Sequence, residues 1–267
     1  MNTRILNQFL AVFFATVALL LATGCSTVPE TGRKQLNLLS PAEEMQLGLS
    51  SFEQTKQSTP INKDPAVNDM VQRVGKRIAA VAPLPGAQWE FVVFDSPEAN
   101  AFCLPGGKVG VYTGILPITK DEAGMATVIG HEVAHAVARH GAERVSEQIL
   151  LQTGGSVLGA SLSGSDPRTQ AIVMTAYGVG GTVGRQLPHS RAQESEADYL
   201  GLVYMARAGY DPEAAVGFWQ RFAEYNRQQG GGGDLWFLRT HPLDETRIKQ
   251  LQEWMPKAKA EYRPAAK

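Results

Sequence analysis

The sequence predicts an α+β fold that is predominantly helical, and three observations support this. Helix-start signals recur along the chain, in which Ser, Asp or Thr stands just before a proline or a glutamate. Several segments place their apolar residues on one helical stripe. Only two short runs, 89–95 and 108–114, are rich in the β-branched and aromatic residues typical of strands. We therefore expect helices packed on a small antiparallel sheet.

Two helices are expected before these strands and a third after them. Ser40 begins one helix with a capping box, and Asp64 begins a second, each followed by a proline. A longer helix over 123–145 follows the strands, and Thr119 with Glu122 is predicted to cap it. This third helix contains the apolar sequence GHEVAHAVARHG.

The second half of the chain is also expected to be helical. Residues 149–187 are glycine-rich and nearly uncharged, and two apolar halves separated by GSDPR predict a helical hairpin. Each half is too short to span a bilayer, so the hairpin either covers the functional site or leans on lipid or a partner; we favour the covering role. Further helices are expected over 190–209, from Asp211 onward, and over 240–255 after a glycine-rich loop.

Composition and charge limit the class of protein. The chain has 267 residues, of which 43% are hydrophobic and 19% charged, enough for one domain with extensions. Its net charge is −1, from 25 basic and 26 acidic residues, and neither sign forms a long run. Nucleic acid is therefore not expected as a partner.

The N-terminus is typical of an export signal. Arg4 precedes an uncharged apolar run over 9–22, which is shorter than the ~20 residues of a spanning helix. The ending Ala-Thr-Gly-Cys resembles the lipobox of bacterial lipoproteins, in which the signal is cut before the cysteine and Cys25 is lipidated. A plain N-terminal anchor is the alternative. Ser26 at the next position implies sorting to the outer membrane.

These features divide the chain into four predicted parts. A signal peptide occupies 1–24, a polar and irregular tether 25–39, the folded domain 40–258, and a flexible tail 259–267. All of the chemistry is expected within the third part.

Two histidines and a glutamate stand in the apolar helix at a metal-binding spacing. On a helix of ~100° per residue, His131 and His135 are about 40° apart, so both rings point toward one spot. His140 is about half a turn from His131 and is not a natural third member. With Glu132 beside the pair, the segment matches H-E-x-x-H, in which zinc takes the histidines and the glutamate acts on water. The alternative is a chance pair on a solvated helix, which the apolar flanking residues disfavour.

A catalytic zinc site needs at least one further protein ligand, and the sequence ESEAD supplies carboxylates. Glu194 and Asp198 share a helix face, whereas Glu196 points elsewhere. We predict Glu194 as the third ligand and Asp198 as the acceptor for the free ring nitrogen of a ligand histidine. A solvated helix face is the alternative for this pair. Donors without thiolate favour one zinc per chain, although cobalt and manganese suit the same ligands, and amide hydrolysis is the expected reaction.

Four stretches together resemble one protease family. The sequences HEVAHAVARH, SRAQESEADYLG, NAFCLPGGKVGVYTG and THPLDETRI resemble the HtpX-like and CAAX-prenyl-endopeptidase family of zinc metallopeptidases, in its soluble periplasmic lipoprotein branch. The resemblance implies a gluzincin-type fold and a zinc site of His131, His135 and Glu194 with Glu132 as general base. It also implies endoproteolysis of misassembled envelope proteins.

The resemblance also gives roles to residues of the last two stretches, NAFCLPGGKVGVYTG and THPLDETRI. It implies an edge strand that pairs with an extended substrate, formed by Asn100, Val109, Gly110, Val111 and Tyr112; an ordinary hairpin is the alternative. It favours a role for His241 at the metal site, either donating to the developing oxyanion or ligating zinc in a resting state, with helix capping as the alternative. Arg247 is expected to tie the last helix to the carboxylates around Asp198.

The resulting hypothesis is a zinc endopeptidase of the bacterial periplasm, held by its lipid anchor at the outer membrane, that degrades unfolded or misassembled envelope proteins. One alternative is a non-catalytic chaperone or assembly lipoprotein for outer-membrane proteins, and another is a hydrolase of cell-wall amides. Glu132 favours the enzyme, because a binding protein has no use for a general base at a metal site.

Overall fold

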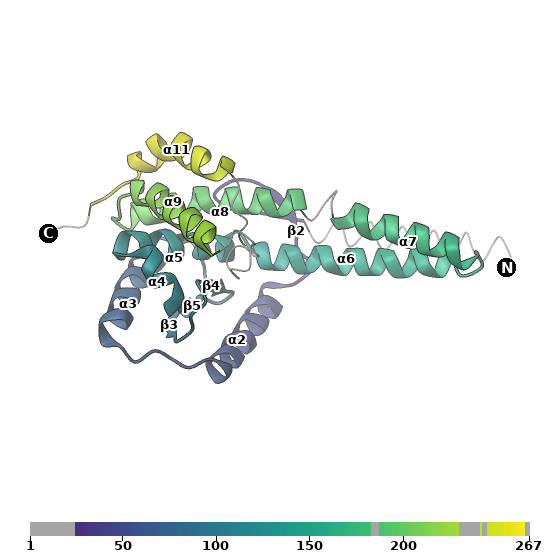
Figure 1. The fold of residues 1–267 in the computed structure, drawn as a ribbon, viewed down its shortest axis with the longest axis horizontal. Coiled ribbons are helices and arrows are strands. Elements are labelled where there is room, and N and C mark those ends of the chain that lie inside the picture. The colour runs from purple at the N-terminus through teal and green to yellow at the C-terminus, as the bar shows by residue number, and fades with distance from the viewer. Residues whose placement is uncertain (1–24, 183–186, 230–240, 242–244, 265–267) are drawn as a thin grey trace. The chain divides into compact units, whose positions relative to one another are not determined.

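The computed structural model describes residues 25–182, 187–229, 241 and 245–264. They fold mainly as helices with two small sheets (Figure 1), which confirms the predicted α+β, predominantly helical class. Contacts along the chain define two units, which are described separately: unit 1 is Met1–Glu43 with His140–Gln186, and unit 2 is Glu44–Arg139 with Leu187–Lys267. The predicted signal peptide lies outside the described residues, and the predicted domain limits stay predictions.

Unit 1 contains a two-stranded sheet near the start of the described chain. β1 (Cys25–Thr27) pairs antiparallel with β2 (Lys34–Leu36). Between them Gly32 adopts a φ of 71°, a left-handed conformation that glycine tolerates and that lets the chain reverse. The irregular conformation expected over 25–39 is therefore wrong for these two strands.

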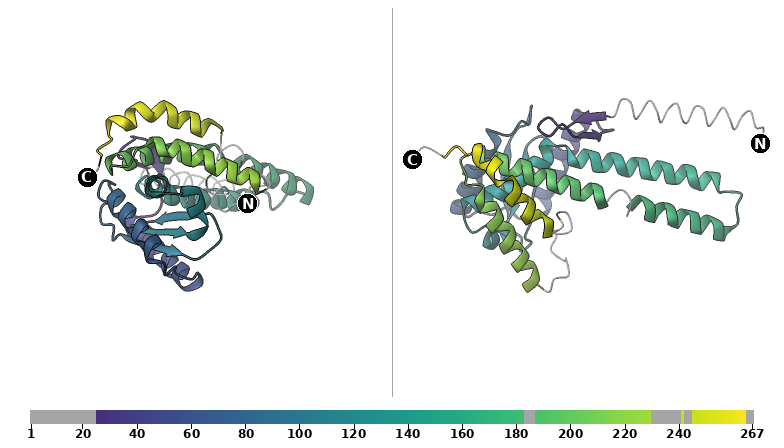
Figure 2. Two further views of the ribbon diagram at one scale, coloured as in Figure 1. Left: turned by 60° about the vertical axis from the view of Figure 1, so that its left-hand side comes forward. Right: turned by 90° about the horizontal axis from the view of Figure 1, so that it is seen from above.

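Unit 1 also contains the predicted helical hairpin. α6 (His140–Ser161) and α7 (Pro167–Gly181) run antiparallel beside each other (Figures 1 and 2). Asp166 caps α7 by accepting hydrogen bonds from two backbone amides of its first turn. The hydroxyl of Tyr177 donates to the carbonyl oxygen of Leu151 at 3.1 Å and joins the two helices. Among the helices that the structure describes, none combines the length and the apolar character needed to cross a membrane.

The sheet of unit 2 has three strands with β5 (Lys108–Tyr112) in the centre. β3 (Glu90–Phe94) pairs parallel with β5, and β4 (Ala101–Leu104) pairs antiparallel with its other side. The antiparallel pairing expected for the two longer runs is wrong, because β4 lies between them in sequence and reverses the chain twice. The sequence pattern did not reveal β4, since it has only four residues and ends directly before Pro105.

Helices make up the rest of unit 2. They are α2 (Pro41–Ser58, from Glu44 on), α3 (Pro65–Ala79), α4 (Leu116–Thr119), α5 (Glu122–Val137), α8 (Leu187–Arg207), α9 (Glu213–Gln228) and α11 (Glu245–Ala260), with a 3-10 turn at Thr113–Ile115. The predicted caps are confirmed at Ser40, whose amide donates to Glu43 at 2.8 Å, and at Asp64. The cap expected from Thr119 is wrong: Asp121 accepts from the amide of Gly124 and starts α5.

α5 is the central helix of unit 2, where it contacts α3, α8, α9 and β4 (Figure 1). Nearly all of its residues are buried. Its contact with α8 is close because two glycines meet there. A Cβ atom on Gly201 would lie 3.0 Å from the backbone nitrogen of His131, and one on Gly130 would lie 3.0 Å from the carbonyl oxygen of Gly201. This approach of the two backbones brings the carboxylates of α8 to the histidines of α5.

α5 ends at Val137, so the continuous helix expected over 123–145 is wrong. Arg139 breaks it by adopting a left-handed φ of 57°, and its guanidinium pairs with the carboxylate of Glu44. α6 then begins at His140. His140 therefore belongs to a different helix from His131.

Candidate metal centre

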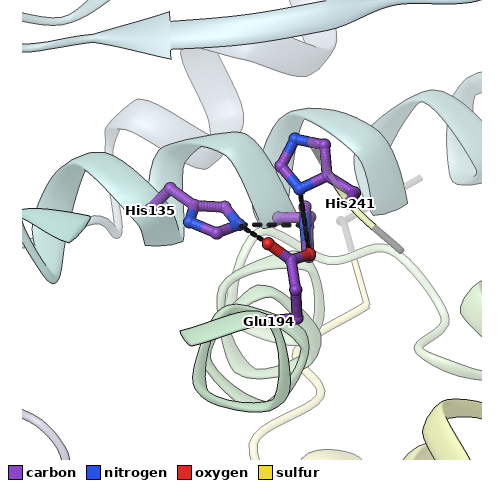
Figure 3. A group of neighbouring side chains, drawn as sticks. His135, Glu194 and His241 are labelled. Atoms are coloured by element: carbon purple, nitrogen blue, oxygen red, sulfur yellow. Dashed lines mark hydrogen bonds and ion pairs between the residues drawn. The ribbon is translucent and has the colours of Figure 1, made fainter. Parts of the chain in front are cut away.

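Four side chains converge on one point in unit 2. They are His131 and His135 from α5, Glu194 from α8, and His241 from the segment before α11, and their possible ligand atoms all lie within 4.8 Å of one another. All four side chains are buried. Figure 3 shows the rings of His135 and His241 turned toward the carboxylate of Glu194. The three residues predicted as ligands are thus brought together, and His241 joins them.

The spacing of a helix turn places the two imidazoles of α5 on the same face. The Nε2 atoms of His131 and His135 are 3.1 Å apart. Each oxygen of the Glu194 carboxylate faces one of them: Oε2 lies 3.3 Å from Nε2 of His131, and Oε1 lies 3.3 Å from Nε2 of His135. One carboxylate therefore bridges both rings.

His241 approaches the same point from outside the two helices. Its Nδ1 lies 3.1 Å from Nε2 of His131 and 2.9 Å from Oε2 of Glu194. Its other ring nitrogen, Nε2, lies 3.3 Å from Oε1 of Glu132. The glycine-rich loop expected before His241 lies outside the described residues. The ring thus stands between the predicted ligands and the predicted general base.

The donor set fits a zinc ion. Tetrahedral zinc with nitrogen and oxygen ligands at about 2.0–2.2 Å holds those ligand atoms about 3.3–3.6 Å from one another. The separations among His131, His135 and Glu194 are 3.1 and 3.3 Å, close to that range. Imidazole and carboxylate without thiolate are donors that zinc accepts readily.

The charges around the centre favour a cation. Burial by itself lowers the pKa of His131, but hydrogen bonds to Asp198 and Glu194 outweigh it and raise the pKa to about 9. Burial raises the pKa of Glu194, but the charges of His135 and His241 outweigh it and hold the pKa well below its usual range. The first shift reflects the carboxylates around the His131 ring, and the second keeps the Glu194 carboxylate ionised. Ionised carboxylates at this point attract a divalent cation.

Asp198 and Arg247 form a second layer behind the ligands. Asp198 Oδ1 lies 3.0 Å from Nδ1 of His131, which leaves Nε2 of that ring pointing toward the other donors. Arg247 donates two hydrogen bonds of 2.7 Å to the Asp198 carboxylate and lies 3.4 Å from Oε2 of Glu194. The tie expected between the last helix and Asp198 is therefore present in the structure.

Trp219 of α9 also belongs to this layer, and sequence analysis did not identify it. Its side chain is 1% exposed, and its ring centroid lies 5.7 Å from that of His131. The guanidinium of Arg247 stacks over the same indole at 3.8 Å from the centroid. In the sequence Trp219 stands in an apolar stripe with Phe218 and Phe222, a pattern that predicts an ordinary core residue equally well.

The strand expected as the substrate edge is not at an edge. Four of its five residues, Val109, Gly110, Val111 and Tyr112, form β5, which pairs with a strand on each side in the described sheet. Asn100 stands just before β4, one of the two terminal strands, and β4 packs against α5. The prediction failed because β4 was not recognised and its position was given to β5.

Comparison with known proteins identifies the family. Residues 65–255 match peptidase family M48. The chain belongs to peptidase family M48. It is 36% identical over 234 residues to the mitochondrial metalloendopeptidase OMA1 of Schizosaccharomyces pombe, covering 86% of this chain and 66% of that protein. It is 32% identical over 273 residues to OMA1 of Saccharomyces cerevisiae, covering 96% and 76%. The beta-barrel assembly-enhancing protease of Escherichia coli K12 is 27% identical over 241 residues, covering 89% and 49%.

Membership of M48 confirms the prediction of a metalloprotease, and M48 peptidases are zinc-dependent. Membership of the HtpX-like and CAAX-prenyl branch is not shown, since the relatives described above are OMA1 and an assembly-enhancing protease. The chain spans 66%, 76% and 49% of the length of the three relatives described above. Its own substrates and partners are therefore matters for proposal.

The predicted location, lipid-anchored in the bacterial periplasm at the outer membrane, is wrong. Three relatives at 32% to 36% identity, including one from Arabidopsis thaliana, bear the name of a mitochondrial enzyme, whereas the bacterial assembly-enhancing proteases reach only 27% to 29%. An apolar N-terminal run that ends in small residues is not specific enough to fix a compartment. The lipidation of Cys25 stays a prediction, because the structure does not describe that side chain.

Proposed function

We propose that this M48 chain is a zinc endopeptidase whose metal is held by His131, His135 and Glu194. The observation that supports it best is the convergence of these three buried side chains at ligand spacing, with Glu132 next to the first of them. A bound zinc ion polarises a peptide carbonyl and makes a water molecule more acidic. The remaining steps fall to side chains of the protein.

Glu132 is the proposed general base. It is 4% exposed and directly precedes the helix turn that ends in His135. A carboxylate beside the metal accepts a proton from the attacking water and returns it to the leaving amine. A buried carboxylate is costly to maintain, and its place at the ligand cluster accounts for its presence through function rather than packing.

Asp198 and Arg247 are proposed to orient the ligands. The bidentate pair fixes Asp198, and Asp198 in turn holds the His131 ring through Nδ1. Neither side chain contacts the reacting atoms in this scheme. Their effect is exerted through the position of His131.

For His241 we propose a blocking role in the described conformation. Its Nδ1 lies 3.1 Å from His131 Nε2, and a neutral imidazole there would supply a fourth ligand and so close the position that a catalytic zinc site keeps open. The alternative is that His241 donates to the oxyanion that develops during hydrolysis. Helix capping is the third possibility and predicts no effect on turnover.

Replacing His241 separates these roles. If the imidazole blocks the metal, His241→Ala raises the rate of cleavage at equal zinc occupancy, because a coordination position is freed. If it stabilises the oxyanion, the same substitution lowers turnover by ~10²–10³. Initial rates on a quenched peptide, normalised to measured zinc content, decide between them, and an unchanged rate excludes both.

We propose extended segments of unfolded or misassembled membrane proteins as substrates. The name of the beta-barrel assembly-enhancing protease of Escherichia coli supports this choice. β4 supports it as well: of the two terminal strands of the described sheet it is the one that packs against α5, and a terminal strand offers backbone groups to an extended peptide. The edge is thereby reassigned from β5 to β4.

The test of the proposed enzyme uses two substitutions in the metal centre. Glu132→Gln should lower cleavage of an unfolded protein by ~10²–10⁴ while zinc stays near one ion per chain, because the base does not hold the metal. Glu194→Ala should lose zinc and activity together. Glu196→Ala on the same helix is the control and should keep both.

Two results would contradict the proposal. Full zinc affinity in Glu194→Ala would exclude that residue as a ligand, and substantial cleavage by Glu132→Gln would remove the base from the mechanism. Parallel assays on peptidoglycan and on refolding of an outer-membrane protein address the cell-wall and chaperone alternatives. Refolding activity that survives Glu132→Gln would favour the non-catalytic chaperone, whereas cleavage of peptidoglycan without cleavage of unfolded protein would favour the cell-wall hydrolase.

A further inference from the structure

The α6–α7 hairpin exposes apolar side chains to an unusual degree. No residue from 148 to 182 is buried. Eight large hydrophobic side chains are exposed in the described part of the chain, and six of them lie on this hairpin: Val145 42%, Ile149 40%, Val157 39%, Ile172 60%, Met174 36% and Val179 56%. Exposed apolar side chains concentrated on one element mark an interaction surface.

The hairpin is also almost free of charge. Between Glu147 and Arg185 the sequence has two charged residues, Asp166 and Arg168, and both stand at the turn between the helices. Helices that face water ordinarily carry charged residues on their outer side. Here that side has alanine, glycine, serine, threonine and glutamine beside the exposed valines and isoleucines.

Ile172 and Val179, the two most exposed of these side chains, do not lie between the two helices of the hairpin. The two helices meet through Tyr177 and Leu151, and a Cβ atom on Gly154 would lie 2.3 Å from the Tyr177 hydroxyl oxygen. On α7, Ile172 and Val179 are seven residues apart and share the side turned away from Tyr177. Their apolar surface is therefore available to something outside the hairpin.

The distribution of charge favours lipid over a protein partner. A protein interface is apolar at its centre but is surrounded by a polar and charged rim. The apolar layer of a bilayer disfavours charge on every side of an inserted helix. In the hairpin, residues 148–165 and residues 169–182 contain no charged side chain. Neither helix therefore has a charged face along these stretches. The sequence has a second uncharged apolar segment at residues 9–22, which also suits lipid.

We propose that the α6–α7 hairpin embeds in the interfacial layer of a lipid bilayer without crossing it. α7 has 15 residues, about 22 Å of helix, which is shorter than the ~30 Å apolar layer. The backbone polar groups are paired within the helices, so they tolerate an apolar surrounding. Ile172 and Val179 enter the apolar region, and the charged residues of the turn reach the headgroups.

Vesicle binding tests the proposal with the full chain. The double variant Ile172→Glu/Val179→Glu should bind phosphatidylcholine vesicles at least about tenfold more weakly in a flotation assay, because each carboxylate opposes insertion. The control Leu47→Glu/Ile61→Glu changes two exposed apolar residues outside the hairpin and should bind like the unaltered protein. Equal loss in both variants would overturn the proposal.

The apolar N-terminal segment can itself bind vesicles, so a second measurement is needed to show which part of the chain contacts lipid. A photoactivatable phosphatidylcholine should label the tryptic peptides 145–168 and 169–185, which the arginines of the sequence delimit. Labelling confined to other peptides would overturn the proposal. So would a dimer of the unaltered protein, seen without vesicles, that the double variant does not form, because the partner of the hairpin would then be a second copy of this chain. Cleavage of a soluble unfolded protein should be the same in all variants, so this result is independent of the protease assignment.

Discussion

The helices of the metal centre and those of the hairpin differ in what their glycines do. In α5 and α8, Gly130 and Gly201 let two backbones approach until a Cβ atom would lie 3.0 Å from main-chain atoms. In α7, a Cβ atom added to Gly178 or Gly180 would meet no neighbouring atom within 4 Å. Glycine thus serves close packing of two backbones at Gly130 and Gly201 and leaves open surface at Gly178 and Gly180.

The two regions also treat charge in opposite ways. The metal centre buries Glu194, Asp198 and Arg247 and pairs each of them with a partner of opposite charge or with imidazole. The hairpin avoids charge and exposes its apolar groups. Composition alone does not tell a buried helix that carries metal ligands from an exposed apolar helix, since both are rich in apolar residues. The polar residues at helical spacing distinguish them.

The largest effect on stability is expected from breaking the buried pair. Arg247→Met leaves the Asp198 carboxylate buried without its guanidinium and should lower the free energy of unfolding by about 3–5 kcal/mol. Arg73→Met breaks an exposed pair with Glu122, in which the side chains are 58% and 38% exposed, and should cost under about 1 kcal/mol. Urea unfolding of both variants gives the comparison. Equal costs would mean that the buried network is not what stabilises the centre.

A smaller effect, on zinc affinity, is expected from changing Asp198, which lies between Arg247 and His131. Asp198→Asn keeps the shape of the side chain but weakens the hydrogen bond that orients His131, so zinc affinity should fall by ~10–100-fold. Competition with a chelator of known affinity measures the change. Zinc affinity equal to that of the unaltered protein would restrict Asp198 to its contact with Arg247.

The smallest effects compare the two kinds of glycine directly. Gly201→Ala adds a methyl group against the backbone of His131 and should lower the free energy of unfolding by about 1–3 kcal/mol. Gly178→Ala adds it in open space within a helix and should raise that energy by up to about 1 kcal/mol. Thermal unfolding of the two variants should therefore shift in opposite directions. Melting temperatures that change in the same direction would contradict the distinction between the two kinds of glycine.

The centre was predictable from sequence where a single helix turn fixes the geometry. The spacing of His131 and His135, and of Glu194 and Asp198, places each pair on one face without knowledge of the rest of the fold. His241 and Arg247 are different, because they come from a distant segment and only family resemblance pointed to them. Trp219 gave no distinct signal, since an indole behind a metal ligand has the same periodicity as one in any core.

The errors in the predicted fold have local causes. A four-residue strand before Pro105 is too short for its alternation to be seen, and missing it turned a parallel pair into an antiparallel one. The end of α5 depends on Arg139 in a left-handed conformation, which nothing in an arginine indicates. Location failed for another reason, because the N-terminal pattern is read by cellular machinery and does not follow from folding physics.

The position of the hairpin in the chain has a consequence for folding order. α6 and α7 stand between the helix that carries His131 and the helix that carries Glu194, so they form most of the loop that must close before the ligands meet. Loop-closure entropy rises only slowly with length, by about 0.6 kcal/mol for each doubling. A hairpin of antiparallel helices makes local contacts that can form early and shorten the effective loop. The chain between α6 and α7, at residues 162–166, is accordingly a place where inserted sequence costs the metal centre little.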